Sequence, residues 1–198
     1  MLSSISPFGE RARNSRWWVT VGAYLTGSTL GGAATGLVAG AVGELLDGTI
    51  SSTAALGVLA VAAVAGLAVE MGWWSLRVPS LVRRQVNEDW LTTYRGWVYG
   101  LGFGFQLGLG LATIVVTSTV WLTWLAAILA GSWQAGLLIG TCFGAARGAF
   151  ILTTAPVQEP DQLRSLFRRI ADTAPAVHRA AALCVAFTAV TALGGALT

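Results

Sequence analysis

Two charged residues lie inside apolar stretches of this chain, where an isolated charge is costly. Glu70 falls in the tract 54–74, and Arg147 falls in the tract 134–153. Ionisable groups at membrane depth pair with one another, reach for the headgroups or contact a substrate. We therefore predict an interhelical ion pair between Glu70 and Arg147. The alternatives are independent snorkelling of the two side chains and a substrate-binding charge.

Uncharged polar residues form a second candidate site, a polar path within the tract 96–133. Around a broken helix, hydroxyl and amide side chains can line a small hydrated path, because irregular backbone at membrane depth is tolerated beside protein or a cavity. Hydrogen bonding between helices is the structural alternative. The candidate residues of this path are Gln106, Thr113, Thr117 and Ser118.

The remaining reactive side chains give weak signals. Cys142 and Cys184 fall near the middle of separate apolar tracts, so neighbouring helices could bring them together as a redox pair. They form no C-x-x-C motif, however, and buried cysteine is commonly a small apolar residue. His178 lies beside Arg179 at the start of an apolar tract, where an interfacial role is favoured. Without a cluster of His and Cys ligands, we predict no metal, no cofactor and no catalytic residue.

The composition places these residues in a membrane protein. Hydrophobic residues make up 55% of the 198-residue chain and charged residues only 11%, which is too little charge to cover a water-facing surface. A net charge of +3 is also too small to indicate a nucleic-acid partner. Five apolar tracts reach the roughly 20 residues that cross a bilayer. They are 17–43, 54–74, 96–133, 134–153 and 180–197.

The basic residues, all of them arginine, predict the orientation. Eleven of the twelve fall in the segments 1–16, 77–95 and 154–179, and positive residues concentrate in cytoplasmic loops. If all three segments are cytoplasmic, two helical hairpins and a final span follow. We divide the chain accordingly into a cytoplasmic N-terminal segment, a first hairpin, a second hairpin with a broken helix, and a last transmembrane helix. Their bounds are 1–16, 17–94, 95–179 and 180–198.

The phrase S-L-x-R-R occurs at both 80–84 and 165–169, at the end of each predicted hairpin. This recurrence indicates an internal duplication of parallel units. The basic segments that contain it carry apolar residues at helical spacing with arginines on other faces. Such a pattern is typical of amphipathic helices at the headgroup boundary, so membrane lipid is an expected partner.

The tract 96–133 is too long for a single span. Its 38 residues would form a helix of about 57 Å, against a hydrocarbon core of about 30 Å. We place a break at 113–120, where β-branched residues crowd a helix and hydroxyl groups can satisfy freed backbone groups. The expected fold is all-α: a polytopic bundle of five spans plus a broken or re-entrant half-helix. Six full spans are the alternative.

Small residues predict how the helices pack. Glycines recur every four residues, which lets two helices approach closely in lipid, where apolar burial gives little drive to associate. The glycines that we assign to helix packing are Gly32, Gly36, Gly40, Gly140, Gly144 and Gly148.

One stretch resembles a known family. The segments FQLGLGLATIVVTSTVWLTWLAAILAGS (105–132) and GLLIGTCFGAARG (136–148) resemble the cytochrome c biogenesis protein CcdA and the membrane domain of DsbD. The resemblance implies a duplicated bundle that passes reducing equivalents across the membrane through two cysteines. That family has Pro-Cys at the helix break, where this chain has Val115, Val116 and Thr117. No catalytic cysteine is therefore carried over, and a scaffold without the redox centre favours transport or an accessory role.

Three functions follow from these observations. We predict a small integral membrane protein with a transporter-like bundle that moves an unidentified solute or ion. The alternative is a non-catalytic transmembrane subunit or assembly factor of a larger membrane complex, and the third is a thiol–disulfide relay. An enzyme is not expected. We expect a homo-oligomer or a larger complex in the bacterial cytoplasmic membrane, with the N-terminus inside.

Overall fold

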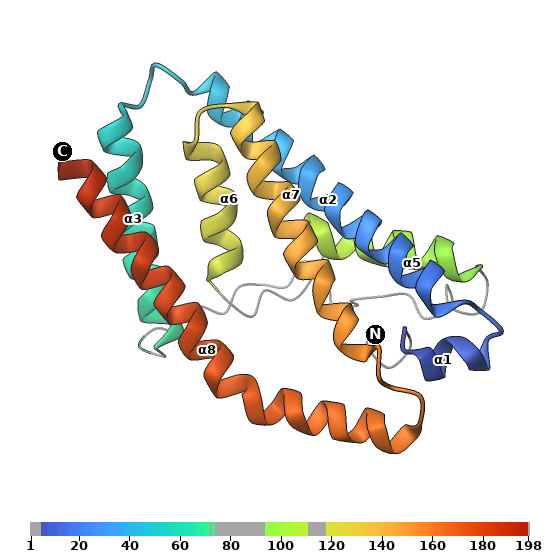
Figure 1. Cartoon of the computed structure of the whole chain (residues 1–198). Coiled ribbons are helices and arrows are strands. Elements are labelled where there is room, and N and C mark those ends of the chain that lie inside the picture. Colours follow the sequence, from blue (N-terminus) through green and yellow to red (C-terminus); the bar gives the residue numbers. More distant parts are fainter. Residues whose placement is uncertain (1–4, 72, 74–93, 111–117, 198) are drawn as a thin grey trace. The chain divides into compact units, whose positions relative to one another are not determined.

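The computed structural model describes residues 5–71, 73, 94–110 and 118–197, which are predominantly helical and include no strand (Figure 1). The all-α fold class is thus confirmed. The described helices are α1 (Pro7–Ala12), α2 (Trp17–Leu45), α3 (Ser52–Glu70), α5 (Gly96–Leu109), α6 (Thr119–Leu129), α7 (Trp133–Ala149), the 3-10 helix η1 (Phe150–Thr154) and α8 (Pro160–Leu197).

Four of these helical segments are long and apolar enough to cross a membrane. They are Trp17–Leu45, Ser52–Glu70, Trp133–Thr154 and Pro160–Leu197. The other apolar helices are shorter, since α5 has 14 residues and α6 has 11, against the roughly 20 that a span requires. A multi-span membrane protein is supported, whereas the count of five spans is not confirmed among the described residues.

The long tract 96–133 is interrupted, but its first helix ends earlier than we predicted. The sequence favoured a break at 113–120, yet α5 already ends at Leu109. Gly110 follows with φ of 69°, a left-handed conformation that suits glycine, and its N–H donates to the carbonyl of Leu107 at 3.1 Å. α6 then begins at Thr119, inside the predicted break. Residues 113–117 lie outside the described residues.

The predicted amphipathic segment and the last span belong to one helix. α8 runs without interruption from Pro160 to Leu197, so residue 180, where we placed the start of the last span, lies within a helix. Pro160 suits the first position because an N–H is not required there. Pro175 lies inside the helix, where proline removes one backbone hydrogen bond. The first copy of S-L-x-R-R lies outside the described residues, so the duplication stays a prediction.

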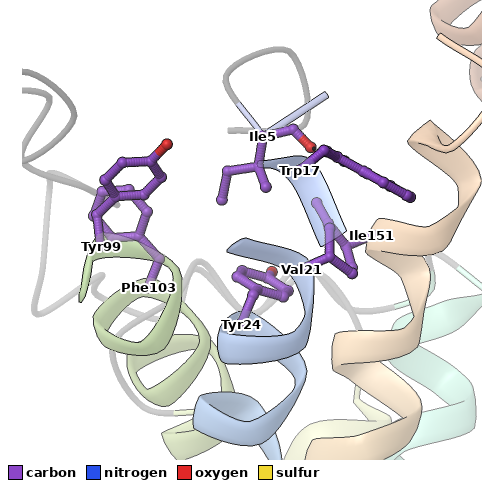
Figure 2. Close-up of a cluster of buried hydrophobic side chains, with 7 residues drawn as sticks. All are labelled: Ile5, Trp17, Val21, Tyr24, Tyr99, Phe103 and Ile151. Carbon is purple, nitrogen blue, oxygen red and sulfur yellow. Dashed lines mark hydrogen bonds between the residues drawn. The ribbon is translucent and has the colours of Figure 1, made fainter. Parts of the chain in front are cut away.

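The chain divides into two compact units. The first contains the described residues within 1–33, 81–114 and 141–173, and the second contains those within 34–80, 115–140 and 174–198. The helices α2, α7 and α8 contribute to both units. The first unit has a core of aromatic and branched side chains from α2, α5 and η1 together with Ile5 (Figure 2); its members are Ile5, Trp17, Val21, Tyr24, Tyr99, Phe103 and Ile151.

In the first unit, α2 and α5 run parallel and in close contact. Gly100 lies against the backbone of Thr20, and Gly104 and Gly108 lie one and two turns further along, against Tyr24 and Ser28. A Cβ at Gly104 would overlap the carbonyl oxygen of Tyr24. Glycine is therefore required for this approach, and the parallel direction brings the N-termini of both helices to the same end of the unit.

The helices α2 and α7 run antiparallel and also meet at glycines. In the second unit, Gly36 and Gly40 lie against Gly136 and Gly140. In the first unit, the Ser28 hydroxyl donates to the carbonyl of Gly144 at 2.7 Å. All six glycines that the sequence analysis assigned to packing lie in these close approaches: Gly32, Gly36, Gly40, Gly140, Gly144 and Gly148.

The second unit has a smaller core in which α3, α6 and α8 meet. Its buried members are Ala63, Leu122, Val185 and Ala189. The members from α3 and α8 include the small side chains Ala63 and Ala189, as expected where helices associate in lipid.

Candidate functional site

The carboxylate of Glu10 is fully buried in the first unit. It is placed there by the short helix α1, whose Ser6 side chain accepts a hydrogen bond from the N–H of Gly9 at 3.1 Å. Pro7 occupies the first turn, where its missing N–H costs nothing. A buried carboxylate requires partners, because an unpaired charge inside a protein is strongly destabilising.

Among the described residues, three side chains hydrogen bond to Glu10. Arg13 donates to Oε1 at 2.7 Å, Thr20 donates to Oε2 at 2.9 Å, and the Tyr99 hydroxyl donates to Oε1. Thr20 lies in the first turn of α2, and Tyr99 lies in the first turn of α5. The carboxylate therefore joins α1 to the beginnings of two parallel helices. Gly96 leaves room for this network, since a Cβ there would lie 2.5 Å from Thr20 Oγ1.

Arg13 is held in place from two directions. Its guanidinium carbon lies 5.6 Å from the centroid of the Tyr99 ring, and its side chain is 26% exposed. Burial lowers the pKa of Arg13, but its hydrogen bond to Glu10 and its further interactions with Glu10 and Tyr99 together outweigh burial, so the pKa is raised overall. A raised pKa contributes stability that is present below the unfolded-state pKa and is lost only as the pH rises through the folded-state value. Arg13 consequently stays charged at every pH of practical interest.

A cavity of about 730 Å³ lies beside this network, and we call it the arginine cavity. Its lining includes three arginines and three aromatic residues; they are Arg13, Arg16, Arg95, Tyr94, Trp97 and Tyr99. No carboxylate is among its described lining residues. The described walls therefore carry an excess of positive charge, which favours an anionic ligand.

Arg16 and Arg95 occupy matching places in this cavity. Arg16 directly precedes α2, and Arg95 is the cap residue of α5. Both side chains are exposed, and neither has a hydrogen-bond or ion-pair partner among the residues that the structure describes. Since α2 and α5 are parallel, the partial positive charges of both helix starts add to the guanidinium charges.

The sequence analysis assigned Arg13, Arg16 and Arg95 to membrane orientation alone, and it did not select Glu10. The sequence does contain one pattern that relates Arg16 to Arg95. The arginines at 16 and 95 each directly precede a helix start that contains tryptophan, in the phrases R-W-W-V and R-G-W-V. That shared pattern places two cations at equivalent ends of two helices, although only the structure shows that the two ends lie together.

In the second unit, Glu70 has partners that the sequence did not predict. Its side chain is 4% exposed, and Oε1 accepts hydrogen bonds from the Ser118 backbone N–H at 2.7 Å and from the Ser118 hydroxyl at 3.0 Å. His178 Nδ1 lies 3.6 Å from Oε2. The carboxylate thus joins the end of α3 to the start of α6 and to α8. It also satisfies an N–H at the start of α6, where the helix dipole favours negative charge.

Arg147 lies in the first unit, with its guanidinium carbon 5.6 Å from the centroid of the Phe143 ring. This distance is within the range of a cation–π interaction. Because Glu70 belongs to the second unit, its predicted ion pair with Arg147 stays a prediction.

The other predicted site residues are distributed as follows. Cys142 and Cys184 are free and exposed. Of the candidate polar path, Gln106 lies in α5 and Ser118 contacts Glu70, while Thr113 and Thr117 lie outside the described residues. Within the described ranges, no group of three or more His, Cys, Asp or Glu side chains could hold a metal ion.

Comparison with known proteins finds two similar proteins that have the same name. This chain is similar to MauF. It is 36% identical over 135 residues to the methylamine utilization protein MauF of Paracoccus versutus, covering 66% of this chain and 48% of that protein. It is 28% identical over 148 residues to MauF of Methylophilus methylotrophus, covering 74% of this chain and 52% of the relative. The chain therefore spans about half the length of these MauF proteins.

No family model matches the chain, and no solved structure matches it significantly. The similarity to MauF and the absence of a matching family model give no support to the resemblance to CcdA and DsbD. The name of the MauF proteins refers to the utilization of methylamine and mentions neither a transported solute nor a redox reaction.

Proposed function

We propose that this chain is a membrane-embedded accessory protein of methylamine utilization. The observation that carries the proposal is the similarity to MauF over 66% of the chain at 36% identity. The aligned part is long enough to include several of the membrane-length helices. This proposal corresponds to the non-catalytic subunit or assembly factor that the sequence analysis gave as its alternative, and it replaces transport as the favoured function.

The contacts of the buried carboxylates favour an accessory role over a catalytic one. The two buried carboxylates that the structure describes most fully, Glu10 and Glu70, each join three helices through hydrogen bonds or charge contacts. Groups held in this way stabilise a bundle and are poorly placed to exchange protons with a substrate. The exposed side chains of α8, with Leu183 and Phe187 both 71% exposed, offer an apolar face for lipid or a membrane partner.

A gene deletion in the organism that encodes this chain tests the proposal. We expect loss of growth on methylamine as the sole nitrogen source, normal growth on ammonium, and recovery when the chain is supplied again. The variants Gly36→Ala and Gly22→Ala form a matched pair for complementation, because only the first would introduce a clash between helices. Unchanged growth of the deletion strain on methylamine would contradict the proposal.

Uptake of labelled methylamine separates the accessory role from transport. An accessory protein leaves uptake by the deletion strain normal while growth is lost. Loss of uptake together with growth would instead restore transport as the function. Purification of the tagged chain in mild detergent adds a second measurement, in which a stoichiometric membrane partner is the expected result for a subunit or assembly factor.

A further inference from the structure

We propose that the arginine cavity binds the phosphate group of an anionic phospholipid. The inference goes beyond the proposed function and depends only on the geometry of the first unit. The class of ligand is inferred from the charge of the cavity, the chemistry of its arginines, its position at the helix ends and its volume.

Among the described residues, two of the three arginines that line the cavity have no carboxylate partner. Glu10 pairs with Arg13 at 2.7 Å, whereas the side chains of Arg16 and Arg95 have no partner among the described residues. Two guanidinium groups are thus available at the cavity in addition to Arg13. The planar fork of a guanidinium matches the oxygens of a phosphate and can bind two of them at once.

The turn between α1 and α2 brings two of these arginines to the same cavity. Asn14 has a φ of 53°, a left-handed conformation that asparagine tolerates better than most residues. Arg13 and Arg16, on either side of this turn, both line the cavity. Because Glu10 and Tyr99 already fix Arg13, little conformational freedom remains to be lost at that residue when an anion binds.

The cavity lies at the start of a membrane-length helix, which favours a lipid as the source of the phosphate. Trp18 is 71% exposed in the first turn of α2, and Trp97 is 52% exposed in the first turn of α5. Exposed tryptophans at helix ends mark the level of the lipid headgroups. Basic pockets between helices at this level are suited to anionic headgroups.

The volume of the cavity is large enough for a lipid headgroup. A volume of about 730 Å³ is larger than a phosphate ion requires and falls within the range of small-molecule sites. The aromatic walls formed by Tyr94 and Trp97 can contact the glycerol and the upper acyl chain. Soluble phosphates share the same recognition chemistry, so the experiment must separate the two sources.

The test uses the full-length chain in nanodiscs of phosphatidylcholine with increasing amounts of phosphatidylglycerol. Retained phosphatidylglycerol is counted by native mass spectrometry, and the thermal unfolding midpoint is measured in parallel. The test variant is R16Q/R95Q. The control is R168Q/R169Q, which removes the same charge from exposed positions on α8 outside the cavity. We expect R16Q/R95Q to bind phosphatidylglycerol about tenfold more weakly than the wild type. The control removes only surface charge from a segment expected at the headgroup boundary, so it should weaken binding by a much smaller factor.

Three results would overturn the proposal. Equal weakening in both double variants would reduce the effect to general surface charge, and normal binding by R16Q/R95Q would exclude the cavity. The third result concerns the source of the phosphate. Inorganic phosphate and glycerol 3-phosphate are added separately to the chain in uncharged detergent. We expect neither to raise the thermal unfolding midpoint at millimolar concentration. Stabilisation that depends on Arg16 and Arg95 would reassign the site to soluble phosphate. Arg16 and Arg95 are exposed, so R16Q/R95Q should retain wild-type helical content by circular dichroism.

Discussion

The fully buried carboxylate of Glu10 accepts a hydrogen bond from the hydroxyl of Tyr99, a residue 89 positions later in the chain. Thr20 binds the other oxygen of the same carboxylate. This one side chain therefore links α1 to two parallel helices at the end where the arginine cavity lies.

Replacement of Glu10 by Gln should destabilise the first unit. The amide keeps the shape of the carboxylate but leaves Arg13 without its charged partner. We expect the free energy of unfolding to fall by ~2 kcal/mol, below the loss for a completely buried pair because Arg13 is partly exposed. Chemical unfolding of the full chain in detergent measures the change. Tyr99→Phe, which removes one hydrogen bond, should cost about 1 kcal/mol. A Glu10→Gln variant as stable as the wild type would show that the pair contributes nothing.

The contact between α2 and α7 in the second unit should depend on Gly36. A methyl group at this position would overlap the carbonyl oxygen of Gly136 and lie 2.7 Å from the Cα of Gly140. Gly36→Ala should therefore destabilise the chain by roughly 1–3 kcal/mol, because neither backbone can move aside easily. Gly22→Ala in the same helix meets nothing within 4 Å and should be neutral or slightly stabilising. Similar melting temperatures for the two variants would contradict the close approach.

Glu70 should stabilise the start of α6 through Ser118. Glu70→Gln weakens the acceptor of two hydrogen bonds, and we expect a loss of about 1 kcal/mol, with a comparable loss for Ser118→Ala. The predicted pair with Arg147 is tested separately by the charge exchange Glu70→Arg with Arg147→Glu. Recovery of stability in the exchanged variant, relative to each single variant, would support the pair. Absence of recovery would leave Ser118 and His178 as the partners of Glu70.

Much of the fold could be predicted because length and hydropathy determine membrane-length helices. The apolar tract 17–43 corresponds to α2, which ends at Leu45, and the tract 134–153 corresponds to α7 with η1. The end of α5 could not be predicted in the same way. Glycines at 104 and 108 continue the helix and Gly110 ends it. Only the contacts of Gly104 and Gly108 with α2 distinguish packing glycines from a terminating one.

The candidate site was harder to predict than the fold. Arginine beside an apolar tract has an adequate explanation in membrane orientation, so the pattern shared by Arg16 and Arg95 did not by itself indicate binding. Glu10 is one acid among basic residues, and its partner Tyr99 is distant in sequence. Bringing these residues together requires the parallel packing of α2 and α5, a tertiary relationship that hydrophobic periodicity does not encode.

Both cysteines should react independently of the redox conditions. Cys142 and Cys184 are free and exposed, and they belong to different units. After denaturation in acid, N-ethylmaleimide should add to two thiols per chain in oxidised and in reduced membranes alike, as counted by mass spectrometry. Loss of both additions under oxidising conditions, restored by reductant, would revive the thiol–disulfide relay.

The orientation predicted from the arginines can be tested with single cysteines in a background of Cys142→Ala and Cys184→Ala. If the apolar tracts 17–43 and 54–74 are two consecutive crossings, we expect position 83 on the same side as the N-terminal arginines. The distribution of positive charge predicts that Arg168 lies on that side as well. Position 83 lies outside the described residues, so this test depends on the sequence alone. An impermeant maleimide should label Arg83→Cys and Arg168→Cys from the cytoplasmic face, and Thr49→Cys, in the connection between α2 and α3, from the opposite face. Labelling of 83 and 168 from opposite faces would exclude the two-hairpin arrangement.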